Sequence, residues 1–285
     1  MQIGVIYPQT ELAPDPATLR AYASEVEQMG YRHILVYDHV LGVDPIAHQG
    51  WEGPYDVDTP FHEPFVMFGF LAALTSIELV TGIVISPQRQ TALLAKQAAE
   101  VDILAEGRFR LGVGVGWNRV EYESLGQDFA TRGRREEEQV DLLRLLWRQR
   151  TVNFDGRFDR IRGAGICPRP VQQPIPIWMG GSSRAAFERV GRCADGWFPM
   201  MAPGERLEEA LRLIAHSAQR ADRDHATIGM EGRIPADADS SRFADKWREA
   251  GATHVTVDTM RAGHADLRSH LSALEQTARS LELNR

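Results

Sequence analysis

Short runs of β-branched and aliphatic residues alternate along this chain with longer stretches in which apolar residues recur every three or four positions. The short runs have the length and composition of buried strands, and the longer stretches have the period of helices with one buried face. We expect strands at Ile3–Tyr7, His33–Tyr37, Leu79–Ile85, Phe109–Val115, Ile177–Met179, Gly196–Phe198, Thr227–Gly232 and His254–Asp258.

Helical segments fill the intervals between these strands. Several begin at Pro or at a Ser, Thr or Asp cap and end at Gly, as helix termini prefer. The segments are Pro16–Met29, Pro64–Thr75, Thr91–Leu104, Arg134–Gln149, Ser183–Cys193, Glu205–Asp222, Arg242–Ala250 and Asp266–Leu281. About eight strand–helix units predict the α/β class and a single (β/α)₈ TIM-barrel domain over residues 1–285.

Two connections are too long to be simple turns. Residues 39–63 follow the second strand and are rich in Pro, Gly, Trp and Tyr, and we interpret this insertion as a wall of the active site. Residues 150–176 precede the fifth strand. Within them, Thr151–Phe158 predicts a small hairpin with its turn at Asp155–Gly156, which we expect to cover part of the barrel mouth.

Composition and charge narrow the class of protein. The chain has a formal net charge of -7, 43% hydrophobic residues and 25% charged residues, an ordinary balance for a soluble globular protein. Arg132, Arg134 and Arg135 are followed at once by three glutamates, so we interpret them as a solvated helix start and expect no nucleic-acid partner. Cys167 and Cys193 lie outside any metal-ligand spacing, so no metal site is expected.

The amino-terminal residues predict a first strand, because their apolar run is too short for a signal peptide or a membrane span. We therefore expect a cytoplasmic protein with no membrane partner. Lysine occurs only at Lys96 and Lys246, and this preference for arginine suggests the GC-rich genome of an actinobacterium.

Polar residues at the carboxyl ends of barrel strands are the candidates for chemistry. Asp38 and His39 follow the second strand directly. An imidazole can exchange a proton near neutral pH, so His39 is our candidate catalytic residue. The alternative is that the pair ties the long loop to the barrel rim by hydrogen bonds. His48, His62, Glu63 and Glu121 are scattered among loops, and we interpret each as a loop-fixing or surface residue.

Glycines mark the third and fourth strands. Gly82 interrupts an apolar strand, and Gly114, Val115, Gly116 and Trp117 continue an alternation of glycine with valine. This pattern is not a dinucleotide-binding fingerprint. It thins one face of the strand, which would admit either a flat ring or the facing helices.

The segment Gly180, Gly181, Ser182 and Ser183 lies between the fifth strand and a helix start. Backbone N–H groups, hydroxyls and the positive end of the helix dipole together favour a bound phosphate. The alternative is an ordinary N-cap, with glycine for the turn and serine for the cap.

Together these pieces resemble the luciferase-like oxidoreductase superfamily, most closely its branch dependent on the deazaflavin coenzyme F420, along nearly the whole chain. The segments that carry the resemblance are Tyr37–His39, Thr81–Arg89, Leu94–Asp102, Gly107–Trp117 and Pro176–Gly181. The resemblance implies a homodimer of barrels that bind F420 or reduced FMN at the carboxyl end of the strands.

The resemblance also implies roles for individual residues. Asp38 and His39 would flank the reactive part of the ring, and the Ile83–Val84 bond matches the non-proline cis peptide of relatives, beside Gly82. The segment Gly114–Trp117 would line the ring, and Gly180–Ser183 would hold the phosphate. Some deazaflavin sugar-phosphate dehydrogenases have a catalytic Glu where this chain has Trp117, so a sugar phosphate is not the expected substrate.

Three functions remain open at this point. The first is hydride transfer between F420 and a small organic substrate. The second is an FMNH2-dependent monooxygenase, and the third is a non-catalytic flavin-binding barrel. The intact pair of Asp38 and His39 argues against the third.

Overall fold

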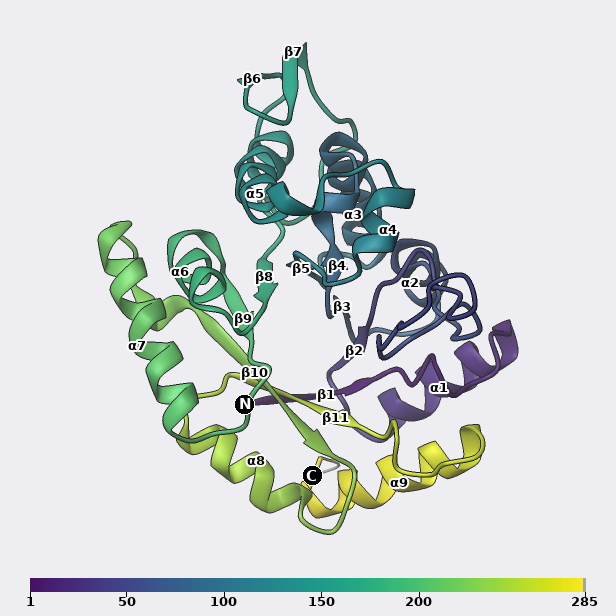
Figure 1. The fold of residues 1–285 in the computed structure, drawn as a ribbon. Coiled ribbons are helices and arrows are strands. Elements are labelled where there is room, and N and C mark those ends of the chain that lie inside the picture. The colour runs from purple at the N-terminus through teal and green to yellow at the C-terminus, as the bar shows by residue number, and fades with distance from the viewer. Residues whose placement is uncertain (284–285) are drawn as a thin grey trace.

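The computed structural model describes residues 1–283. Within them, a sheet of nine strands closes on itself, because β3 (Glu78–Thr81) pairs both with β2 (His33–Val36) and with β5 (Phe109–Gly114). The other strands of this sheet are β1 (Gln2–Ile6), β4 (Val84–Ile85), β8 (Ile177–Gly180), β9 (Gly196–Phe198), β10 (Gly229–Pro235) and β11 (His254–Asp258). All their pairings are parallel, and the predicted (β/α)₈ barrel is confirmed (Figure 1).

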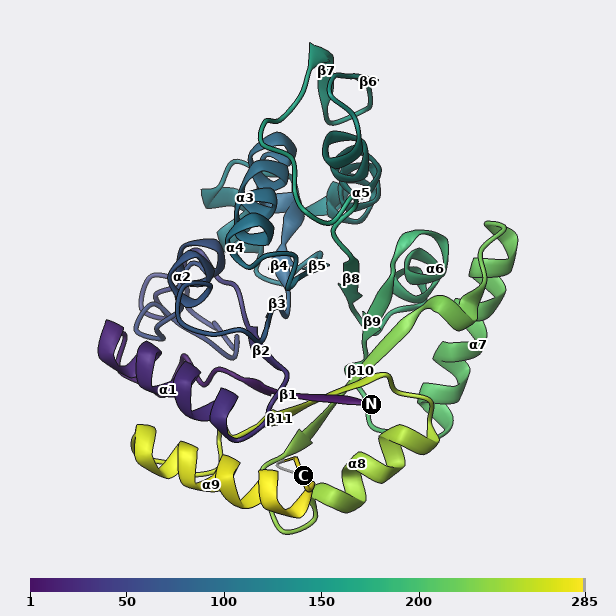
Figure 2. The same ribbon diagram turned by 180° about the vertical axis from the view of Figure 1, so that it is seen from behind.

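Helices surround this barrel in both views (Figures 1 and 2). They are α1 (Pro16–Gln28), α2 (Pro64–Leu71), α3 (Thr91–Leu104), α4 (Arg119–Ser124), α5 (Arg132–Arg148), α6 (Arg184–Cys193), α7 (Glu205–Arg220), α8 (Ser240–Glu249) and α9 (Leu267–Ser280). Their starts follow the expected chemistry: Asp15 caps α1 by accepting the backbone N–H groups of Ala17 and Thr18, and Pro16 is the first helical residue. No helix within residues 1–283 is both long and apolar enough to cross a membrane.

The third strand differs from its prediction, because it is interrupted between β3 and β4. The peptide bond between Gly82 and Ile83 is cis. The expectation of a cis bond between Ile83 and Val84 is therefore wrong by one residue. An extra Cβ at residue 82 would lie 2.2 Å from Cδ2 of Leu35, so any larger residue here would have to displace the Leu35 side chain.

A hairpin formed by β6 (Val152–Asp155) and β7 (Arg160–Ala164) corresponds to the one expected at Thr151–Phe158, with a longer turn. The carboxylate of Glu138 on α5 accepts three backbone N–H groups of this turn at 2.7 to 2.8 Å. The hairpin is thereby tied to the outside of the helical layer, beyond α3 and α5 (Figures 1 and 2). The expectation that it covers the barrel mouth is wrong.

The seventh barrel strand also extends further than predicted, since β10 continues to Pro235 rather than ending at Gly232. A Cβ at Gly232 would lie 2.2 Å from the indole of Trp247 on α8. The glycine that weakens the local strand propensity is therefore the one that lets this helix pack closely on the barrel.

The base of the barrel lumen is closed by a buried network of charged side chains. Arg110 lies 2.6 Å from Glu231 and 2.9 Å from Glu78, and its guanidinium lies 4.2 Å from the ring centre of Trp178. His33 lies 2.8 Å from Glu231. Burial alone would raise the pKa of Glu231, but Arg110 and His33 together lower it well below its usual range. Since these residues lie toward the amino ends of the strands, we assign the network to stability rather than catalysis.

Above the base, the lumen is lined by the buried side chains of Ile6, Leu35 and Val80. Polar side chains appear again above this apolar layer, where Tyr37 and Arg233 meet. Because the carboxyl ends of all barrel strands open on this side, the candidate functional residues face the same mouth.

Candidate active site

A buried carboxylate holds His39 at the mouth of the barrel. Nδ1 of His39 lies 3.2 Å from Oε2 of Glu121, a fully buried residue on α4. Gln88 donates to the same oxygen at 3.0 Å. The backbone N–H groups of Val40 and Leu41 donate to the other oxygen, Oε1, at 2.6 and 3.1 Å. Glu121 therefore fixes both the imidazole and the start of the long loop.

These contacts determine which ring nitrogen of His39 carries the proton. Burial alone would raise the pKa of Glu121, but hydrogen bonds from His39, Gln88 and the loop backbone together lower it. Glu121 is therefore a carboxylate at neutral pH and can only accept, so we assign the proton to Nδ1 of His39. Nε2 of the neutral ring then has a free lone pair, and it has no hydrogen-bond partner among residues 1–283. Such a ring is ready to accept a proton.

Aromatic side chains enclose the same imidazole. Its ring centre lies 4.9 Å from that of Phe61, 5.5 Å from that of Tyr55 and 5.6 Å from that of Trp117. A small cavity borders His39 and these three rings. Tyr55 and Phe61 belong to the long loop, which supports our interpretation of that loop as a wall of the site.

Asp38 is turned away from this ring and is buried. Its Oδ1 accepts a hydrogen bond from Arg89 at 2.8 Å, and its Oδ2 accepts the backbone N–H of Ile85 at 3.1 Å. Burial raises the pKa of Asp38, and Arg89 opposes that shift. Arg89 also contacts Glu63 at 3.1 Å, which supports a loop-fixing role for Glu63. Within this structure Asp38 shapes the rim, and its contact with a cofactor stays a prediction.

Glycines shape the lumen wall beside the interrupted third strand. A Cβ at Gly114 would lie 2.7 Å from the side chain of Ile83, and one at Gly180 would lie 3.3 Å from it. The space left by these two glycines is therefore shared with Ile83. Ile83 and Val115 remain partly exposed at the mouth, whereas Val84 is buried. The side chain of Ile83 covers the two glycines, so a planar group at this wall would rest on Ile83.

The Gly180–Ser183 segment begins α6 as expected. Oγ of Ser183 accepts the backbone N–H of Ala186 at 3.2 Å, so the N-cap interpretation is confirmed for this residue. Gly181 has φ +138°, and a Cβ there would lie 2.7 Å from that of Ala186. Ser182 is exposed and caps nothing. Because the first N–H groups of a helix have no intrahelical acceptor, this end of α6 can still bind an anion.

Glu121 is the functional residue that sequence reasoning misjudged. We interpreted it as a loop-fixing or surface residue. It does hold the long loop through the N–H groups of Val40 and Leu41, but it is fully buried and also contacts His39. Asn118 lies three residues earlier and caps α4 by accepting the N–H of Glu121. The three-residue spacing between Asn118 and Glu121 is typical of a helix N-cap, so the sequence could have predicted this short helix. It could not have predicted that Glu121 contacts His39.

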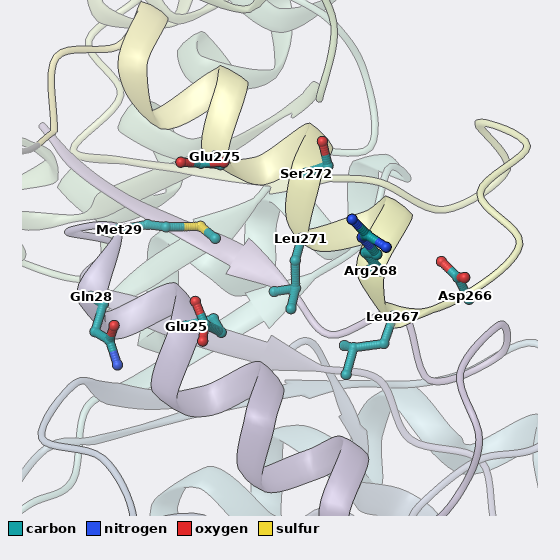
Figure 3. Close-up of a pocket in the computed structure, with 9 residues that line it drawn as sticks. All are labelled: Glu25, Gln28, Met29, Asp266, Leu267, Arg268, Leu271, Ser272 and Glu275. Atoms are coloured by element: carbon teal, nitrogen blue, oxygen red, sulfur yellow. The ribbon is translucent and has the colours of Figure 1, made fainter.

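A separate groove lies between α1 and α9 on the outer helical layer (Figure 3). Its lining combines Leu267 and Leu271 with the charged side chains of Glu25, Arg268 and Glu275. None of the residues predicted for the functional site lines this groove. We therefore locate the candidate site at the barrel mouth.

Comparisons with known proteins agree with this location and fold. The family model described as luciferase-like monooxygenase matches residues 1–281. The chain is 30% identical over 252 residues to F420-dependent glucose-6-phosphate dehydrogenase of Beutenbergia cavernae. The aligned segment covers 85% of this chain and 71% of that protein. It is 33% identical over 148 residues to FMNH2-dependent dimethylsulfone monooxygenase of Pseudomonas putida. That aligned segment covers 50% of this chain and 40% of the relative.

Among solved structures, an F420-dependent secondary alcohol dehydrogenase in complex with an F420–acetone adduct has the same fold. Its TM-score is 0.77 at 16% sequence identity, with 97% of each chain covered. The closed barrel, the mouth built around His39 and the match along nearly the whole sequence lead to one assignment. This chain belongs to the luciferase-like monooxygenase family.

Proposed function

We propose that this protein is an oxidoreductase that transfers a hydride between coenzyme F420 and a small organic substrate at the barrel mouth. The observation that carries the proposal is the contact between the buried carboxylate of Glu121 and His39. It leaves Nε2 of His39 as a proton acceptor beside a small cavity. Oxidation of an alcohol to a carbonyl needs such a group, because a proton leaves the hydroxyl as a hydride leaves the carbon.

The residues at the mouth suit a bound deazaflavin. When bound, this cofactor behaves like a nicotinamide and exchanges a hydride at a ring carbon, without ready activation of oxygen. Gly82, Ile83 and Gly114 to Trp117 would support its ring, and Gly180 to Ser183 would hold its phosphate. His39 takes up the proton at Nε2, and the Glu121 carboxylate stabilises the imidazolium that results.

The second candidate function is an FMNH2-dependent monooxygenase. The specific observation that favours it is the similarity to the dimethylsulfone monooxygenase of Pseudomonas putida. We prefer F420 because the similarity to the F420-dependent dehydrogenase of Beutenbergia cavernae extends over more of the chain.

Titrating the purified protein with F420 and with FMN tests this preference. We expect a lower dissociation constant for F420, measured by cofactor fluorescence. Gly181→Val should raise that constant at least about tenfold, roughly 1.4 kcal/mol, because the side chain obstructs backbone approach to the phosphate. Gly251→Val is the matched control, since residue 251 also has positive φ, at +87°, but precedes β11 at the other end of the barrel. Tighter binding of FMN would favour the monooxygenase. Equal affinities for the two glycine variants would leave residues 180–183 with a capping role alone.

A further inference from the structure

A second polar group reaches the barrel mouth from β10. Side chains alternate along a strand, and Glu231 points into the lumen, where it contacts Arg110. Arg233, two residues later, therefore also points into the lumen, nearer the mouth. In the order of the barrel, β10 lies four strands from β3 in either direction, so Arg233 faces the interrupted third strand across the lumen. Its side chain is 48% exposed.

Only part of the Arg233 guanidinium is occupied. Nη1 donates to the hydroxyl of Tyr37 at 3.0 Å and lies 3.6 Å from Oδ2 of Asp258. Nε and Nη2 make no hydrogen bond with residues 1–283. Because 3.6 Å exceeds the length of an N–H···O hydrogen bond, Asp258 is an incomplete partner of this guanidinium. The free edge of the guanidinium presents two parallel donors, the geometry that carboxylates and phosphates match.

The base of the same lumen shows how an arginine with a purely structural role is arranged here. The side chain of Arg110 is 3% exposed and lies between two carboxylates at 2.6 and 2.9 Å, over the ring of Trp178. Arg233 has neither a second carboxylate within 4.0 Å nor an aromatic ring against its face, among the residues that the structure describes. A structural role alone would not explain an exposed guanidinium with free donors at the mouth of a catalytic barrel.

We propose that Arg233 binds an anionic group of the organic substrate, so that the protein acts on small alcohols or carbonyl compounds that carry a carboxylate. This inference rests on the proposed function, because it places the substrate at the same mouth as His39. Tyr37 links the two groups, since its hydroxyl holds Arg233 and its backbone leads directly into Asp38 and His39. The phosphate of the cofactor offers the same chemistry, so the experiment must separate the two sources.

Isothermal titration calorimetry on the protein saturated with oxidised F420 tests the inference. The probes are two anions, pyruvate and benzoate, and their neutral amides, pyruvamide and benzamide. We expect at least one anion to bind more tightly than its amide. Arg233→Gln should weaken that anion at least about tenfold and leave the amide unchanged, whereas Arg233→Lys should retain part of the affinity because it keeps the charge. Arg248→Gln is the matched control, since Arg248 forms an exposed ion pair with Asp245 near the end of α8, away from the mouth end of β10.

Three results would overturn the assignment of Arg233 to a substrate anion. The first is that neither anion binds the wild-type protein, and the second is that Arg233→Gln leaves the anion affinities unchanged. The third is that the dissociation constant of F420 rises instead, which would assign Arg233 to the cofactor. Failure of the proposed function is seen separately, because the wild-type protein would then fail to bind F420 in the preceding titration.

Discussion

Replacing His39 with Ala is expected to slow substrate turnover by about 10²–10⁴-fold, the usual contribution of a positioned acid–base group. The dissociation constant of the cofactor should change far less, because the proposed contact of Nε2 is with the substrate hydroxyl. The measurement is single-turnover reduction of oxidised F420 by an alcohol that the wild type oxidises, beside a cofactor titration of the same variant.

Glu121→Gln is the companion variant. It keeps an oxygen that can accept the loop N–H groups, but it removes the carboxylate that stabilises an imidazolium on His39. We expect the pH at which alcohol oxidation is half-maximal to fall, because the imidazolium loses the carboxylate that stabilises it and the unprotonated ring is the form that accepts the substrate proton. A rise in that pH would contradict this role of Glu121. Turnover of His39→Ala within a few-fold of wild type, with an unshifted pH profile for Glu121→Gln, would reduce both residues to fixing the rim.

Replacing Glu231 with Gln is expected to cost about 3–5 kcal/mol in the free energy of unfolding. The substitution keeps the shape of the side chain but leaves Arg110 with Glu78 as its one remaining carboxylate partner within 4.0 Å in residues 1–283. It also removes the carboxylate that contacts His33. Urea unfolding of the variant and the wild type measures the loss.

The effect of Glu231 should depend on pH with a definite sign. Its folded pKa is lowered from the ordinary value of 4.5, so its stabilisation is complete above about pH 4.5 and is lost as the pH falls through the folded value. The difference between wild type and Glu231→Gln should thus be constant near neutral pH and shrink in acid. Glu275→Gln, which breaks an exposed pair with Arg279, is the control and should cost under about 1 kcal/mol. Equal costs for the two variants would contradict a stabilising role of the barrel-base network.

The barrel could be predicted because its strands are short, doubly buried and separated by helices with clear caps, such as Asp15 before α1. The predictions that were wrong concern features that depend on contacts between residues far apart in the sequence. Parallel pairing with β11 extends β10 to Pro235, which lies opposite Asp258. Hydrogen bonds from the hairpin turn to Glu138 drew the hairpin away from the barrel mouth.

In the candidate site, too, local sequence predicted positions but not contacts between distant residues. The position of His39 followed from the end of a strand, but its partner Glu121 lies 82 residues away and no local pattern joins them. The arginine-rich start of α5 is a similar case. We expected its arginines to be balanced by the glutamates that follow, yet Glu136 and Glu137 pair with Arg189 of α6. The order of charged residues along one helix does not identify their ion-pair partners, because a neighbouring helix can supply the opposite charge.

The central claim is that hydride passes between the substrate carbon and F420 without oxygen. The most direct measurement is mass spectrometry of F420 after anaerobic incubation with the protein and alcohols deuterated at the carbinol carbon, including 2-hydroxy acids. A hydride delivered to a ring carbon stays there, so the account predicts one deuterium in the reduced cofactor. No deuterium from any of these alcohols, together with oxidation of the same compounds only when FMNH2 and oxygen are supplied, would contradict it.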